Sequence, residues 1–185
     1  MFFKGGFSTI FKEISLNKNQ RNFLFFALSS FVLFPILNSI HAINDWLTHL
    51  VTTASRHFIG FVSSNTPWGY YNSTLKTYHV FDSRGHIMVG DPCNGFELYY
   101  VCAAFIVAIP GISIKRKLWF SISGIFILFA ANVIRVSALF YIAKSHPEWF
   151  ETFHKTVFQL GVYVIMFIIW IIYLKPLHGK DSQKS

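Results

Sequence analysis

Long apolar blocks separated by short polar segments run through this chain, and the length of these blocks predicts membrane spans. About 20 apolar residues are needed to cross a bilayer as a helix. Four blocks approach this length, at residues 22–40, 96–112, 118–143 and 156–174. The pattern therefore predicts an all-α polytopic membrane protein with about four transmembrane helices, organised as a single integral-membrane domain over residues 1–185.

The segment between the first two blocks, residues 41–93, has a different pattern. Over residues 43–62 the apolar positions recur at helical spacing, which predicts an amphipathic helix lying on the outer membrane surface. A turn is expected at residues 65–69. Residues 77–81 and 86–89 flank a polar turn, and this arrangement predicts a short β-hairpin whose second strand leads into the second apolar block.

Composition and charge agree with a membrane protein. Hydrophobic residues make up 53% of the 185 residues and charged residues only 13%, whereas a soluble domain is typically about 25% charged. The chain has 16 basic and 8 acidic residues, a net charge of +8. The bases lie between the apolar blocks and are not clustered with stacking aromatics, so nucleic-acid binding is not expected.

The positions of the basic residues predict the orientation of the chain. Ten of them flank what would be one side of the membrane: Lys4, Lys12, Lys18, Arg21, Lys115, Arg116, Lys117, Lys175, Lys180 and Lys184. By the positive-inside rule this side is cytoplasmic. Both termini are then cytoplasmic, and residues 41–93 and the loop at 144–153 are extracytoplasmic.

Three polar residues from different parts of the chain are expected to meet at the outer membrane rim. Cys93 precedes the second block, Arg135 lies about 12 Å inside the outer end of the third, and His154 starts the fourth. Because successive spans alternate in direction, all three arrive at one level. Polar groups at such positions are costly and often functional. A thiol, an imidazole and a guanidinium together suit acyl transfer through a thioester.

Each of these residues also has a simpler interpretation, as a small apolar residue, a snorkelling arginine or an interface histidine. Asn132 lies one turn from Arg135 on the same helix face, which favours a functional stripe. Glu97 is an unusual buried acid that would pair with a cation, polarise the site or reach the interface. The outer histidines lack compact ligand spacing, so no metal site is expected. They are His41, His49, His57, His79 and His86.

Three motifs in order resemble the exosortase/archaeosortase family of membrane-embedded cysteine transpeptidases. They are Cys93-Asn94-Gly95 at the start of a span, Asn132-Val133-Ile134-Arg135 in a later span, and His154 ahead of Gly161. The resemblance covers about residues 75–174. It implies that Cys93 is the nucleophile, Arg135 the electrostatic partner and His154 the acid/base. Asn94, Gly95, Glu97 and Asn132 are the expected substrate-binding or supporting residues. Many members of the family have serine where Asn94 stands.

The resemblance implies an enzyme of the bacterial cytoplasmic membrane with an extracytoplasmic active site. Its partners would be membrane lipid and exported proteins that carry a C-terminal motif, a transmembrane helix and a basic cluster. It would cleave this sorting signal through a thioester, without a cofactor. The other hypothesis is a non-enzymatic scaffold or accessory subunit of an export or polysaccharide-assembly complex. In that case Arg135 and Asn132 would bind a partner span and Cys93 would be structural.

Overall fold

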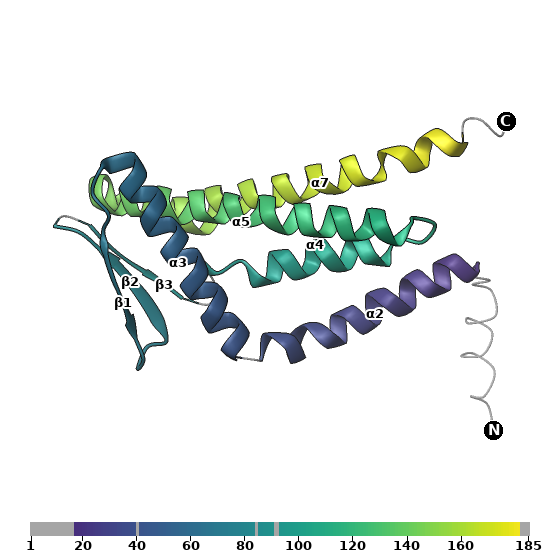
Figure 1. Cartoon of the computed structure of the whole chain (residues 1–185), viewed down its shortest axis with the longest axis horizontal. Helices are drawn as coiled ribbons and strands as arrows, with labels where there is room; N and C mark the ends of the chain where they lie inside the picture. The colour runs from purple at the N-terminus through teal and green to yellow at the C-terminus, as the bar shows by residue number, and fades with distance from the viewer. Residues whose placement is uncertain (1–16, 40, 84, 91–92, 182–185) are drawn as a thin grey trace, which may run out of the picture.

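The computed structural model describes residues 17–39, 41–83, 85–90 and 93–181. Figure 1 shows long helices running along one axis, with a small sheet and a crossing helix at one end. The helices are α2 (Lys18–Asn38), α3 (His41–Ser63), α4 (Phe96–Ala108), α5 (Ile114–Ser145), α6 (Phe150–Thr152) and α7 (Phe158–Asp181), and the strands are β1 (Trp68–Asn72), β2 (Thr77–Phe81) and β3 (His86–Val89). A 3₁₀ turn, Pro147–Trp149, precedes α6, and a π-helical turn, Phe153–Val157, precedes α7. Most of the expected loop at 144–153 is therefore helical.

Two helical stretches of the described chain are long and apolar enough to cross a membrane, Ile114–Ser145 and Pro147–Lys175. The expected second span starts at Phe96 as predicted, but α4 has only 13 residues. At 1.5 Å per residue it is about 20 Å long, shorter than the bilayer core of about 30 Å. It ends early because Pro110 disfavours helical backbone at the residue before it, and Ile109 is extended. The structure thus supports two of the four predicted spans by length and composition.

The ends of the long helices place the basic segments at one end of the molecule. α2 begins, α4 connects to α5, and α7 ends on the side opposite the sheet (Figure 1). Lys115, Arg116 and Lys117, expected in a loop, form the first turn of α5. Lys4, Lys12, Lys184 and the last residue of the expected first span, residue 40, lie outside the described residues.

The expected hairpin is part of a three-stranded antiparallel sheet in the order β1-β2-β3. The strands at residues 77–81 and 86–89 are confirmed. β1 was not predicted, since its first two residues were expected to lie in the turn at residues 65–69. Its sequence, Trp-Gly-Tyr-Tyr-Asn, lacks apolar alternation, and four of its five residues are exposed. β1 forms through its pairing with β2, which a period-two pattern does not reveal.

α3 confirms the helix predicted over residues 43–62, and the face that packs on the protein combines small polar residues with apolar ones. Thr48, Thr52 and Ser55 are buried, and the Ser55 hydroxyl donates to the Val133 carbonyl of α5 at 3.4 Å. Small side chains allow the two helices to approach closely. Phe61, on the predicted apolar face, is 87% exposed. Leu47, also on that face, is partly buried against residues of α4, α5 and α7, so only part of the predicted apolar face is exposed.

α5 connects two apolar cores. The first lies among α4, α5 and α7 and contains Tyr99, Cys102, Ile106, Leu128, Val162, Met166, Ile169 and Tyr173. The second lies among α3, the sheet and α5 and contains Val51, Ile59, Val80, Ile87, Val89, Val136 and Phe140. On α5, Leu128 belongs to the first core and Val136 to the second. The stretch between them, which carries Asn132 and Arg135, therefore lies where the helical bundle meets the sheet.

Candidate active site

The thiol of Cys93, just before α4, lies beside the imidazole of His154. Cys93 Sγ and His154 Nε2 are 3.6 Å apart, within hydrogen-bonding distance for sulfur. His154 belongs to the π-helical turn Phe153–Val157, a feature that is frequent at functional sites. Phe150, one turn earlier, stacks on the imidazole with ring centroids 5.6 Å apart. The fold thus brings together an oriented thiol–imidazole pair from residues 61 positions apart.

Both backbone groups of Cys93 are held by hydrogen bonds. Its N–H donates to the Gly90 carbonyl at 2.8 Å, and its carbonyl accepts from Asn132 Nδ2 at 2.8 Å. The Asn132 side chain is fully buried, so losing this bond would leave buried polar atoms without partners. Asn132, expected as a supporting residue, is therefore in a position to orient the backbone of Cys93.

Gly95 makes the turn between Cys93 and α4. Its φ is +80°, a conformation that costs little only for glycine. A Cβ at this position would lie 2.8 Å from Tyr99 Oη and 3.3 Å from Asn132 Nδ2. The Gly95 carbonyl also accepts the first helical bonds of α4, from the N–H groups of Leu98 and Tyr99 at 3.0 and 3.1 Å. Glycine is thus required here both by the backbone and by the space beside Asn132.

Asn94 is buried and ties the start of α4 to α3. Its Oδ1 accepts from the Phe96 N–H at 2.8 Å, and its Nδ2 donates to Asn44 Oδ1 at 3.0 Å and to Thr48 Oγ1 at 3.3 Å. These hydrogen bonds engage both the oxygen and the nitrogen of the Asn94 amide, so Asn94 supports the site by holding the start of α4 to α3. Asn44 was missed in the sequence. The sequence pattern that could have revealed Asn44 is the series of polar residues at 44, 48 and 52, which are spaced by four along α3.

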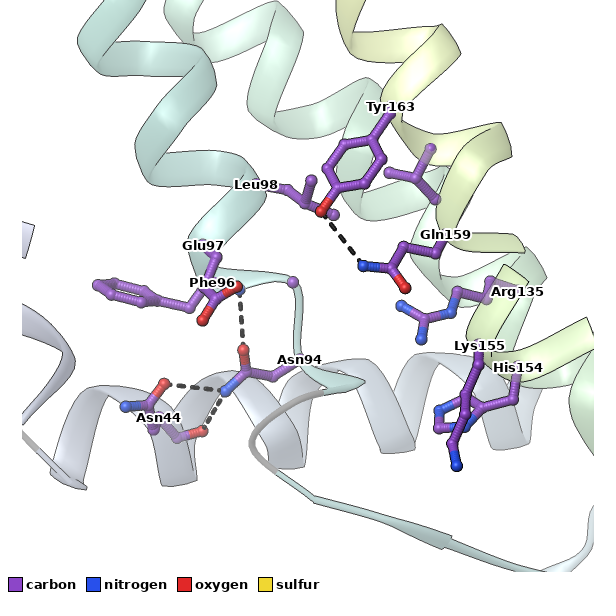
Figure 2. Close-up of a pocket in the computed structure, with 12 residues that line it drawn as sticks. Asn44, Asn94, Phe96, Glu97, Leu98, Arg135, His154, Lys155, Gln159 and Tyr163 are labelled. Atoms are coloured by element: carbon purple, nitrogen blue, oxygen red, sulfur yellow. Dashed lines mark hydrogen bonds between the residues drawn. The ribbon is translucent and has the colours of Figure 1, made fainter. Parts of the chain in front are cut away.

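A polar cavity of about 340 Å³ opens beside the imidazole of His154, and Cys93 is not among the residues that line it. Arg135 and His154 line it together with Asn94 and Gly95, and Figure 2 shows the Arg135 side chain next to Gln159. Arg135 Nε is buried and has no hydrogen-bond partner in the described part of the chain. The guanidinium is therefore available to a negatively charged group bound in the cavity.

Three further polar residues line the cavity that sequence reasoning did not single out. Lys155 belongs to the same π-helical turn as His154, and Gln159 and Tyr163 belong to α7. Gln159 Nε2 donates to Tyr163 Oη at 3.3 Å (Figure 2). The three are spaced by four, so they share one helix face. Polar residues at this spacing within an otherwise apolar block are the sequence pattern that could have revealed these three residues.

Glu97, expected to be a buried acid, is exposed. It stands in the first turn of α4, where a carboxylate interacts favourably with the helix dipole. None of the ion pairs among the described residues includes it. Glu97 lines the polar cavity and also an apolar groove of about 420 Å³ between α2 and α4. It therefore lies at the point where the two spaces adjoin.

Two of the outer histidines lie together on the sheet. His79 Nδ1 and His86 Nε2 are 2.8 Å apart, and Tyr70 stacks on His79 with ring centroids 4.7 Å apart. His49 contacts Tyr78 instead, with centroids 5.3 Å apart. Among the described residues no three His, Cys, Asp or Glu side chains form a group that could hold a metal ion.

Comparison with known proteins agrees with the motifs around this site. A family model described as "Transmembrane exosortase (Exosortase_EpsH)" matches residues 9–173. The match includes Cys93, Arg135 and His154 and almost all of the helical bundle. No curated protein and no solved structure matches the chain. Because the family model covers most of its length, this membrane protein belongs to the transmembrane exosortase family.

Proposed function

We propose that this chain is an integral-membrane cysteine peptidase or transpeptidase that cleaves the C-terminal sorting signal of exported proteins. The observation that carries the proposal is the 3.6 Å contact between Cys93 Sγ and His154 Nε2. Arg135, whose Nε has no partner among the described residues, lines the adjoining cavity with His154. His154 thus links the thiol to the cavity that holds Arg135, and a nucleophile, a base and a cation are the groups that acyl transfer through a thioester requires.

The first half-reaction forms the thioester. His154 Nε2 accepts the proton of the Cys93 thiol, and the sulfur attacks the scissile carbonyl carbon. Arg135 stabilises the negative charge that develops on the carbonyl oxygen. When the tetrahedral intermediate collapses, the C–N bond breaks and His154 returns the proton to the leaving amine. The acyl group stays on Cys93, and the membrane-anchored C-terminal segment leaves.

The second half-reaction releases the acyl group. An acceptor amine or hydroxyl, or water, attacks the thioester carbon while His154 accepts its proton. The C–S bond then breaks, and the proton passes from His154 to the sulfur of Cys93. The product is an amide, an ester or a carboxylic acid according to the acceptor, and the enzyme returns to its starting state.

We place the transmembrane helix of the substrate in the apolar groove between α2 and α4. Ala104 and Ala108 line this groove one turn apart, and small residues at this spacing let helices approach closely within a membrane. The groove adjoins the polar cavity at Glu97. In this arrangement the termini face the cytoplasm, and the scissile segment reaches Cys93 at the extracytoplasmic side.

Co-expression with an exported protein that carries such a C-terminal signal tests the proposal. Cys93→Ala is expected to abolish processing, so that the full-length precursor accumulates on an immunoblot. Cys102→Ala is the matched control, because Cys102 is fully buried in the helical core and lines neither of the cavities that His154 lines. Processing of the substrate by Cys102→Ala should remain near the wild-type level. Unchanged processing in Cys93→Ala would contradict the enzymatic function and favour a scaffold.

A further inference from the structure

A second cavity adjoins the catalytic pair on the side of the sheet. It has a volume of about 200 Å³, and its walls include Cys93 and His154. Val136, Leu139 and Phe150 contribute apolar side chains to its lining. Since His154 lines both this cavity and the polar one, the thiol–imidazole pair stands between an apolar space and a polar space.

Strand β3 forms one wall of the apolar cavity. All four of its residues, His86–Val89, line it. Successive side chains of a strand point to opposite faces of the sheet, so a space that contacts four consecutive residues lies along the strand's edge. β3 is the last strand in the order β1-β2-β3. The cavity therefore runs beside the edge of the sheet.

The hydrogen-bond register shows which backbone groups face this edge. The Asp82 N–H donates to the Gly85 carbonyl at 2.9 Å and the Gly85 N–H donates to Asp82 Oδ1 at 2.7 Å, so residues 82 and 85 face each other as a hydrogen-bonded position of the ladder. In an antiparallel ladder such pairs alternate with non-bonded ones. With Phe81 opposite His86 and His79 opposite Met88, the N–H and C=O groups of His86 and Met88 point away from β2. Neither residue has a backbone bond on that side to another described residue.

We propose that β3 binds the substrate as an added strand, directly beside Cys93. This inference rests on the proposed function and names the part of the substrate that is bound. The leaving segment of the substrate continues into its transmembrane helix, so this segment lies on the side where the polar cavity adjoins the groove between α2 and α4. The acyl segment then extends the other way, along β3. Backbone groups of His86 and Met88 exchange hydrogen bonds with it, as in other complexes that extend a sheet.

Strand addition also predicts the chemistry of the acyl segment. Every second side chain of an added strand points to the same face. One set would lie over Val136, Leu139 and Phe150 and should be aliphatic or aromatic. The other set would lie on the face of the sheet that carries Met88, which is 57% exposed, and should tolerate polar residues. The substrate class is thus an extended segment with apolar residues at alternate positions before the scissile bond.

Covalent labelling of the purified full chain in detergent tests this inference. The probe is a peptide chloromethyl ketone, acetyl-Leu-Thr-Leu-Ala-CH₂Cl, which alkylates Cys93 and presents only acyl-side residues. Two analogues each carry one N-methyl group, on neighbouring amides. Since alternate amides of an added strand face β3, one analogue should label about five- to tenfold more slowly than the parent, the worth of one backbone hydrogen bond. The neighbouring analogue should label at close to the parent rate.

Two proline variants provide a second measurement. Met88→Pro removes an N–H that faces the cavity, whereas Tyr71→Pro removes one on the far edge of the sheet, which β1 forms. Peptide labelling, divided by the iodoacetamide labelling of the same variant, should fall about fivefold only in Met88→Pro. Equal labelling by both N-methyl analogues and the parent would overturn strand addition and leave the enzymatic proposal intact. A Cys93 inert to iodoacetamide and peptide alike would overturn both.

Discussion

Replacing Gly95 by alanine should damage the site, whereas the same change at Gly111 should not. Both glycines have positive φ, +80° and +79°, so alanine is strained by about 1–2 kcal/mol at either position. Only at Gly95 does the new methyl group meet other atoms, 2.8 Å from Tyr99 Oη and 3.3 Å from Asn132 Nδ2. At Gly111 nothing lies within 4 Å.

The contact at Gly95 adds a second cost. Forcing a methyl group into a filled space typically costs about 1–3 kcal/mol, so Gly95→Ala should be destabilised by about 2–5 kcal/mol in total. The methyl group also pushes on Asn132, which donates to the Cys93 carbonyl at 2.8 Å. Gly95→Ala should therefore slow the alkylation of Cys93, because the thiol is displaced from His154.

Thermal unfolding in detergent and timed iodoacetamide labelling measure the two effects. Gly111→Ala should lower the unfolding midpoint slightly and leave Cys93 labelling at the wild-type rate. Gly95→Ala should lower the midpoint further and slow the labelling. Cys102 is fully buried and reports in the same sample whether the fold has opened. Equal midpoints and equal labelling rates for the two variants would show that the crowding beside Asn132 is not what requires glycine.

Three further predictions concern other parts of the chain. Asn132→Asp keeps the shape but removes the donor to the Cys93 carbonyl, so kcat for substrate processing should fall about tenfold or more with KM little changed; a change confined to KM would contradict a positioning role. Burial, followed by the charge of His86, lowers the pKa of His79 below its ordinary value of 6.5. As pH falls, His79 is therefore protonated in the unfolded chain before it is protonated in the folded one, and the folded state should lose stability below about pH 6.5. His79→Gln should flatten this decline between about pH 7.5 and 5.5, and equal slopes in circular-dichroism melts would refute it. Ala104→Leu should reduce processing of an anchored substrate about tenfold by filling the groove, while Cys93 labelling is retained; loss of both would indicate misfolding instead.

Much of the fold was predictable because it depends on local patterns. The period of apolar residues located α3, β2 and β3, and the length of the apolar blocks located α5 and α7. The end of α4 was misjudged because hydrophobicity continues past Ala108, while Pro110 and the extended Ile109 stop the helix. β1 was missed because its pairing with β2, rather than its own pattern, makes it a strand.

The site divides in the same way. The sequence by itself determined that a thiol, a guanidinium and an imidazole stand near the ends of apolar blocks, because such residues are rare and conspicuous in so apolar a chain. Only the tertiary structure decided that Cys93 contacts His154, that Asn132 holds the Cys93 backbone, and that Glu97 is exposed. It alone revealed Asn44, Gln159 and the cavity that runs along β3 beside Cys93. The physical reason is that hydropathy and spacing indicate only which helix face a residue prefers, whereas these contacts join segments tens of residues apart. Their geometry follows from how α3, α5 and the sheet pack together.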